Sequence, residues 1–103
     1  MHYNKRGKFV PYITIGSEEE VIHSVLRDEH DNTYIRPIIV RIEKPDKIYG
    51  FKEVQINLDD MVIEERIGYT DEELRKLIDF LFKNKTRIEE YAECGGVWNW
   101  QQY

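Results

Sequence analysis

The sequence predicts a single α+β domain, in which one long C-terminal helix packs across an antiparallel sheet of three to five strands and a short helix lies near the N-terminus. Three observations lead to this prediction. Several short runs alternate apolar and polar residues, which is typical of half-buried strands. The links between these runs are short, which favours an antiparallel meander. The last part of the chain repeats apolar residues at helical spacing.

The chain begins with a basic segment, 1–8, that contains three Lys and Arg residues. We expect this segment to be a flexible, solvated lead-in. Residues 9–15 then alternate as in a strand. Pro11 lies inside this run, and it predicts an edge strand because proline cannot donate a ladder hydrogen bond.

Residues 18–27 permit two interpretations. Ser17 and Glu20 have the spacing of a capping box, which would begin a helix. The apolar residues that follow fall on one helical face: Val21, Ile22, Val25 and Leu26. Most of them are β-branched, however, and such residues also favour a strand. We predict a short helix here, with a strand as the alternative.

Three further strands are expected at 35–43, 49–58 and 61–67. The middle one alternates clearly. Its residues divide between two faces, with Val54, Ile56 and Leu58 on one and Glu53, Gln55 and Asn57 on the other. Polar turns separate the strands, at 44–47 and at 59–60.

The final helix is the most strongly patterned element, and we expect it over 70–94. Thr70 and Glu73 form a capping box, Tyr69 can pack onto Leu74, and a glycine follows the last turn. The apolar residues at helical spacing are Leu74, Leu77, Ile78, Leu81, Phe82, Ile88, Tyr91 and Ala92. This face predicts much of the core.

Composition bounds the class of protein. The 103 residues are 41% hydrophobic, which fits one folded domain, 9–96, followed by an aromatic tail, 97–103. The net charge of −5 argues against nucleic-acid binding, which needs clustered Lys and Arg. No run approaches the ~20 apolar residues that span a bilayer, and no signal peptide is apparent. We therefore expect a cytoplasmic protein without membrane contact.

Side chains that could carry chemistry are few, and we predict no catalytic residue, no cofactor and no metal site. His23 and His30 lie among acidic residues, but their spacing matches no metal-binding motif. Asp59 and Asp60 could offer oxygen ligands to a cation, although a solvated turn explains them as well. Cys94, the single cysteine, cannot form an internal disulfide. We expect it to be unreactive, because the negative end of the helix dipole opposes thiolate formation.

The residues at the end of the helix depart from the usual preferences for a helix C-terminus, and such departures are expected at functional sites. Acidic residues occupy its last turns, where basic ones are preferred, and aromatics of the kind enriched in binding hot spots follow. The candidate partner-binding residues are Glu89, Glu90, Glu93, Trp98, Trp100 and Tyr103. The alternative is that the tail folds back and completes the core.

These features favour a non-enzymatic protein-interaction module that binds another protein or itself, as a homodimer or an accessory subunit. A metal-dependent nuclease or hydrolase is the alternative from a different class, and it would use His23 and His30, or Asp59 and Asp60. A third possibility is weak nucleic-acid binding through the basic lead-in.

The segment 51–91 resembles a family of small bacterial domains of unknown function whose genes often lie beside toxin–antitoxin-like genes. The shared features are a strand with the sequence VQINL, a glycine before a capped helix start, and an asparagine followed by acidic residues. That family usually carries a histidine on an earlier strand and a tryptophan at the helix end. Here 38–42 contains no histidine, and Tyr91 stands in place of the tryptophan. The resemblance implies a bacterial protein, and no functional residue carries over from it.

Overall fold

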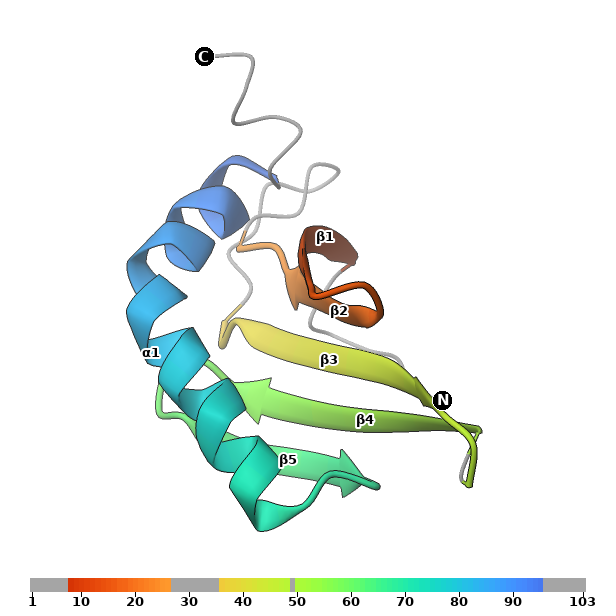
Figure 1. Cartoon of the computed structure of the whole chain (residues 1–103). Helices are drawn as coiled ribbons and strands as arrows, with labels where there is room; N and C mark the ends of the chain where they lie inside the picture. The colour runs from red at the N-terminus through yellow and green to blue at the C-terminus, as the bar shows by residue number, and fades with distance from the viewer. Residues whose placement is uncertain (1–7, 27–35, 49, 96–103) are drawn as a thin grey trace, which may run out of the picture.

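The chain folds into one five-stranded antiparallel sheet with a single helix across one of its faces (Figure 1). The computed structural model describes residues 8–26, 36–48 and 50–95. The elements are β1 (Phe9–Ile15), β2 (Glu19–Ser24), β3 (Ile39–Asp46), β4 (Gly50–Asn57), β5 (Val62–Ile67) and α1 (Asp71–Cys94). Each strand pairs with its neighbour in sequence, so the sheet order is β1-β2-β3-β4-β5. The predicted α+β class and the antiparallel meander are confirmed.

The predicted short N-terminal helix is wrong, because most of the segment assigned to it forms strand β2. Residues 16–18 form the turn between β1 and β2, and Gly16 adopts a positive φ of 63° there. Glu20 lies in the strand, opposite Glu43 of β3, and does not begin a helix. Backbone pairing with β1 and β3 holds this segment as a strand. Its β-branched residues, such as Val21 and Ile22, also fit a pleated surface.

The core lies between α1 and the strands β2, β3 and β4. The fully buried side chains come from both layers and include Val40, Ile42, Val54, Ile56, Leu58, Leu81 and Ile88. The predicted apolar face of the helix is confirmed except at Phe82, which is 61% exposed. Phe82 follows Leu81 by one position, which turns it about 100° around the helix axis and away from the sheet.

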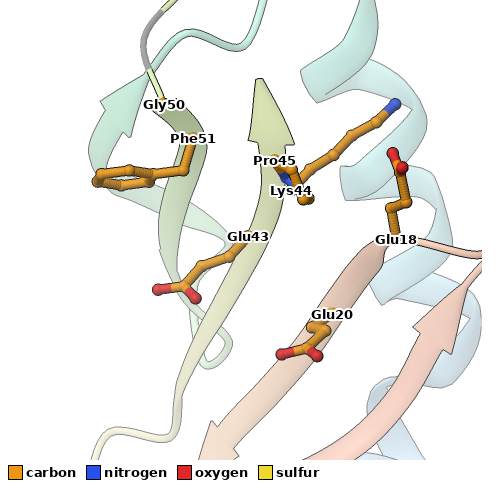
Figure 2. Close-up of a pocket in the computed structure, with 7 residues that line it drawn as sticks. All are labelled: Glu18, Glu20, Glu43, Lys44, Pro45, Gly50 and Phe51. Atoms are coloured by element: carbon orange, nitrogen blue, oxygen red, sulfur yellow. The ribbon is translucent and has the colours of Figure 1, made fainter. Parts of the chain in front are cut away.

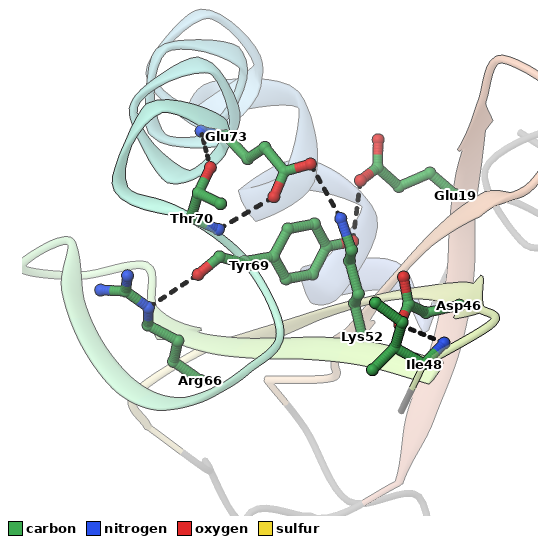
Figure 3. A network of polar contacts seen from close by, with 8 residues as sticks. All are labelled: Glu19, Asp46, Ile48, Lys52, Arg66, Tyr69, Thr70 and Glu73. Atoms are coloured by element: carbon green, nitrogen blue, oxygen red, sulfur yellow. Dashed lines mark hydrogen bonds and ion pairs between the residues drawn. The ribbon is translucent and has the colours of Figure 1, made fainter. Parts of the chain in front are cut away.

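Polar contacts around Tyr69 hold the start of α1 against the strands β2, β4 and β5 (Figure 3). The predicted capping box is confirmed, because Thr70 Oγ1 accepts from the Glu73 amide while the Glu73 carboxylate accepts from the Thr70 amide. The buried Tyr69 hydroxyl donates to Glu19 Oε2 at 2.7 Å. Lys52 Nζ donates to Glu73 Oε2 at 2.9 Å. Burial raises the pKa of Tyr69, so its proton stays available for this bond.

The turn between β3 and β4 lies later than the sequence indicates. Pro45 and Asp46 continue β3 and pair with the first residues of β4. The reversal then follows Asp46, whose carboxylate accepts a hydrogen bond from the Ile48 amide at 3.1 Å. Gly50 closes the turn with a φ of 84°, a conformation that suits glycine.

Candidate functional site

The structure separates the side chains that the sequence offered as weak metal ligands. His23 is fully buried beneath α1, whereas Asp59 and Asp60 lie exposed in the turn between β4 and β5. Asp59 forms an ion pair with Arg36 at 3.1 Å, and Asp60 Oδ1 accepts from the Val62 amide at 3.0 Å. His30 lies outside the described residues. Within the described part of the chain, no group of three His, Cys, Asp or Glu side chains could hold a metal ion.

The acidic residues at the end of α1 lie on its outer side. Glu89 is half-buried, Glu90 and Glu93 are exposed, and no basic residue occupies the last turn. Cys94 is half-buried, and its thiol donates a weak hydrogen bond to the Tyr91 carbonyl at 3.6 Å. The aromatic residues predicted to bind a partner, Trp98, Trp100 and Tyr103, lie outside the described residues. Their binding role stays a prediction.

His23 is a buried imidazole with one nitrogen unpaired. Its Nδ1 donates to the Ser24 carbonyl at 2.9 Å, which leaves Nε2 as an acceptor. Nε2 has no hydrogen-bond partner, and the Tyr12 ring lies 6.2 Å away in an edge-on arrangement. Burial lowers the pKa of His23, and the hydrogen bond to Ser24 only partly offsets this. The ring is therefore held neutral and has no route to a substrate in solvent.

The sheet face that α1 leaves uncovered carries a row of glutamates. We call it the distal face; its residues alternate with the buried ones along β2 to β4 and continue onto β5, and they are Glu20, Ile22, Arg41, Glu43, Glu53, Gln55, Glu65 and Ile67. Glu43 lies directly opposite Glu20 on one side and Glu53 on the other. Like charges directly opposite one another destabilise a sheet. Sequence analysis missed this row, because it depends on the register of three strands.

The glutamate row borders a shallow pocket between the β1–β2 and β3–β4 turns (Figure 2). Its volume is about 280 Å³, and it is lined by Glu18, Glu20, Glu43, Lys44, Pro45, Gly50 and Phe51. Figure 2 shows the carboxylates of Glu20 and Glu43 on the same side of neighbouring strands. Three carboxylates, one ammonium group and the apolar side chains of Pro45 and Phe51 line it, so the pocket has mixed polarity.

A single guanidinium offsets part of this charge. Arg41 lies 3.6 Å from Glu53 Oε2, donates to the Gln55 side chain, and stands 4.6 Å from the centre of the Phe9 ring. Burial is the main cause that raises the pKa of Glu53, and the charges of Glu43 and Glu65 add to it, while Arg41 lowers it. The distal face therefore keeps an excess of negative charge.

Replacing Glu43 with glutamine is expected to raise the free energy of unfolding by about 0.2–1 kcal/mol at neutral pH. The amide removes a carboxylate that faces both Glu20 and Glu53. The folded-state pKa of Glu53 is raised, so the folded state binds a proton there more readily than the unfolded state does. The stability that comes from this proton is present in acid and is lost as pH rises through the folded-state pKa. The gain from Glu43→Gln should therefore disappear in acid.

Urea unfolding of Glu43→Gln at neutral and acidic pH tests this expectation. Glu90→Gln is the matched control, since Glu90 is exposed on α1 and far from the row in sequence. A Glu43→Gln protein that is less stable than the wild type at neutral pH would show that the row is not repulsive.

The outer edge of β5 is the most exposed regular segment of the sheet. All six of its residues are exposed. They include three aliphatic side chains, Val62 at 52%, Ile63 at 38% and Ile67 at 42%. Glu65 pairs with Gln55 and Ile63 with Ile56, so Glu64 is an extra residue that forms a bulge. The bulge leaves Ile63 and Ile67 on opposite faces of the sheet.

Comparison of the chain with protein-family models, with curated proteins and with solved structures finds no match in any of the three. No helix among the described residues has the length and apolar character needed to cross a membrane. A functional assignment therefore rests on the geometry of this chain alone.

Proposed function

We propose that this protein is a non-enzymatic protein-interaction module that binds through the outer edge of β5 (Val62–Ile67). The observation that carries the proposal is the exposure of every residue of β5, three of them large aliphatics. An edge strand presents unpaired backbone N–H and C=O groups, which form a template for another strand. Peptide binding by strand addition uses such an edge, with main-chain bonds for affinity and side-chain contacts for specificity.

The two edges of the sheet differ in how they are protected. β1, at the other edge, contains Pro11, which removes a donor, and a register shift between Pro11 and Ile13. β5 also has a bulge, but it contains no proline and no lysine. Natural proteins commonly protect edge strands with proline, with charged side chains and with bulges, and β5 carries the charged residues Glu64, Glu65 and Arg66. The difference that favours β5 as the binding edge is that it keeps all its backbone donors, whereas β1 lacks one at Pro11.

The positions of the reactive side chains support a non-enzymatic role. His23 is sealed in the core, Asp59 and Asp60 are engaged in their turn, and Cys94 donates to a helix carbonyl. A metal-dependent nuclease or hydrolase would need several of these groups at one accessible place. Their separation gives that alternative no support.

Selection of random peptides displayed against the folded chain tests the proposal. We expect selected peptides to shift the NMR amide signals of residues 62–67 and to protect them from hydrogen exchange. The double variant Val62→Asp with Ile67→Asp should bind such peptides at least about tenfold more weakly, because it loses apolar contact area. Light scattering of the wild type and of the double variant, measured alongside, shows whether a dimer forms and whether it depends on this edge.

The control is Ile13→Asp, which alters a similarly exposed aliphatic residue, 49% exposed, on the opposite edge. It should leave binding unchanged. Peptides that bind elsewhere, or a selection that yields no binder while the chain stays monomeric, would overturn the proposal. Equal loss of binding in the Ile13 variant would do the same.

A further inference from the structure

We infer that the partner of β5 is an extended, basic segment of another protein, in which aliphatic residues alternate with lysine or arginine, and that it adds to the sheet as a sixth strand. This inference rests on the proposed function and names the chemistry of the partner.

The chain around β5 is strongly acidic. Positions 59–73 contain seven acidic residues and one basic residue, Arg66. Arg66 is already engaged, since its guanidinium lies 2.7 Å from the Asp71 carboxylate and also donates to the Tyr69 carbonyl. The ion pairs Arg36–Asp59 and Lys52–Glu73 neutralise two more acids. Acidic residues outnumber basic ones along this stretch even when Lys85 is counted, whose Nζ lies 3.4 Å from the Asp59 carbonyl oxygen, so a cationic strand complements it.

A second copy of this chain fits the edge less well than a basic segment does. Closed antiparallel pairing of two identical edges has a two-fold axis, which places one residue opposite its own copy. The residues at the middle of β5 are Glu64 and Glu65. Pairing centred on either one sets a carboxylate directly against an identical carboxylate, which is destabilising. A second copy, one of the two kinds of partner that the sequence analysis offers, is therefore the less favoured occupant.

The acidic surface continues from β5 onto the distal face. Glu65 pairs with Gln55 and lies close enough to Glu53 to raise its pKa, together with the larger effect of burial and the charge of Glu43. A cationic side chain of an added strand that points to the distal side would approach Glu65 first. It would also reduce the repulsion along the row, because its charge is opposite to that of every glutamate there.

Four synthetic peptides of about ten residues, the length of a long strand, test the inference. In the first three, valine alternates with lysine, with glutamine or with glutamate. The fourth is the lysine peptide with every backbone nitrogen methylated, which keeps the charge but prevents strand pairing along both of its edges. Binding is measured by isothermal titration and by hydrogen-exchange protection of residues 62–67.

We expect the lysine peptide to bind at least about tenfold more tightly than the glutamine peptide, and its affinity to fall as salt is added. The glutamate and methylated peptides should not bind measurably. Glu65→Gln should weaken the lysine peptide about two- to fivefold, whereas Glu90→Gln on the outer side of α1 should not.

The outcomes separate the inference from the proposed function. Equal binding of the lysine and glutamine peptides overturns the basic partner but leaves strand addition at β5 intact. Binding of the methylated peptide shows attraction by charge alone and overturns the sixth strand. Absence of binding by all four peptides, or a dimer that pairs through β5, overturns the inference. The proposed function itself fails if displayed peptides and a second copy both leave β5 unoccupied.

Discussion

Replacing Leu81 with alanine is expected to lower the free energy of unfolding by about 2–5 kcal/mol. Leu81 is fully buried at the middle of α1, where it packs into the main cluster of the core. The truncation removes the transfer free energy of the lost methyl groups and leaves a cavity that neighbouring side chains only partly fill. Leu77→Ala, at a position that is 6% exposed, should lie near the lower end of the same range.

Phe82→Ala provides the matched control. It removes a larger side chain from the next position of the same helix, but Phe82 is 61% exposed. Its effect should stay within about 0.5 kcal/mol, as for most surface substitutions. Thermal or urea unfolding of the variants measures the differences. Equal destabilisation by Leu81→Ala and Phe82→Ala would show that α1 does not pack on the sheet through this face.

The helix was predictable because its signals are local and agree with one another. The Thr70–Glu73 capping box, the apolar spacing and the glycine at position 95 all lie within one continuous segment. The structure confirms each of them. The one misassigned side chain, Phe82, was included because it borders the apolar face, and sequence alone does not show how wide a helix face the sheet can cover.

β2 was misassigned because its local signals conflict. The spacing of Val21, Ile22 and Val25 suits a helix, and their branching suits a strand. The choice is made by pairing partners that lie far away in sequence, such as Ile42 opposite Val21. The residues of this segment alone do not contain this information. Its pairing with β1 and β3 therefore outweighed the helical spacing of its apolar residues.

The candidate site was hidden for a related reason. The glutamate row exists only because the register places Glu20, Glu43 and Glu53 side by side. The exposure of β5 follows from its place at the end of the strand order, which the sequence indicates only through the meander. The predicted site at the helix end uses residues whose aromatic part lies outside the described residues, so it stays a prediction.

Acidification from about pH 7 to about pH 5 is expected to destabilise the wild type more than the variant His23→Phe. The unfolded imidazole titrates near its usual pKa of about 6.5, whereas burial holds the pKa of folded His23 lower. The folded state therefore binds fewer protons in this range. The stability that His23 provides is complete above the unfolded pKa and is lost as pH falls toward the folded one, by up to about 1.4 kcal/mol per pH unit.

Phenylalanine keeps a ring beside Tyr12, which lies 6.2 Å from His23, and it carries no proton. It also removes the unpaired Nε2 and gives up the hydrogen bond to the Ser24 carbonyl. The raised pKa of Glu53 has the opposite sign and favours the folded state in acid, but it is present in both proteins and cancels from the comparison. The quantity to compare is thus the change of unfolding free energy with pH, not its value at one pH.

Urea unfolding of both proteins across this pH range measures that change. An NMR titration of the wild-type imidazole gives a second readout that does not depend on how well the variant folds. We expect the ring of folded His23 to stay neutral well below pH ~6.5. Titration at its usual pKa, or the same loss of stability in His23→Phe, would mean that the ring is reached by water and is not sealed beneath α1. A neutral, sealed His23 in turn supports a role in packing and gives no support to chemistry at this imidazole, in line with the binding proposed at the sheet edge.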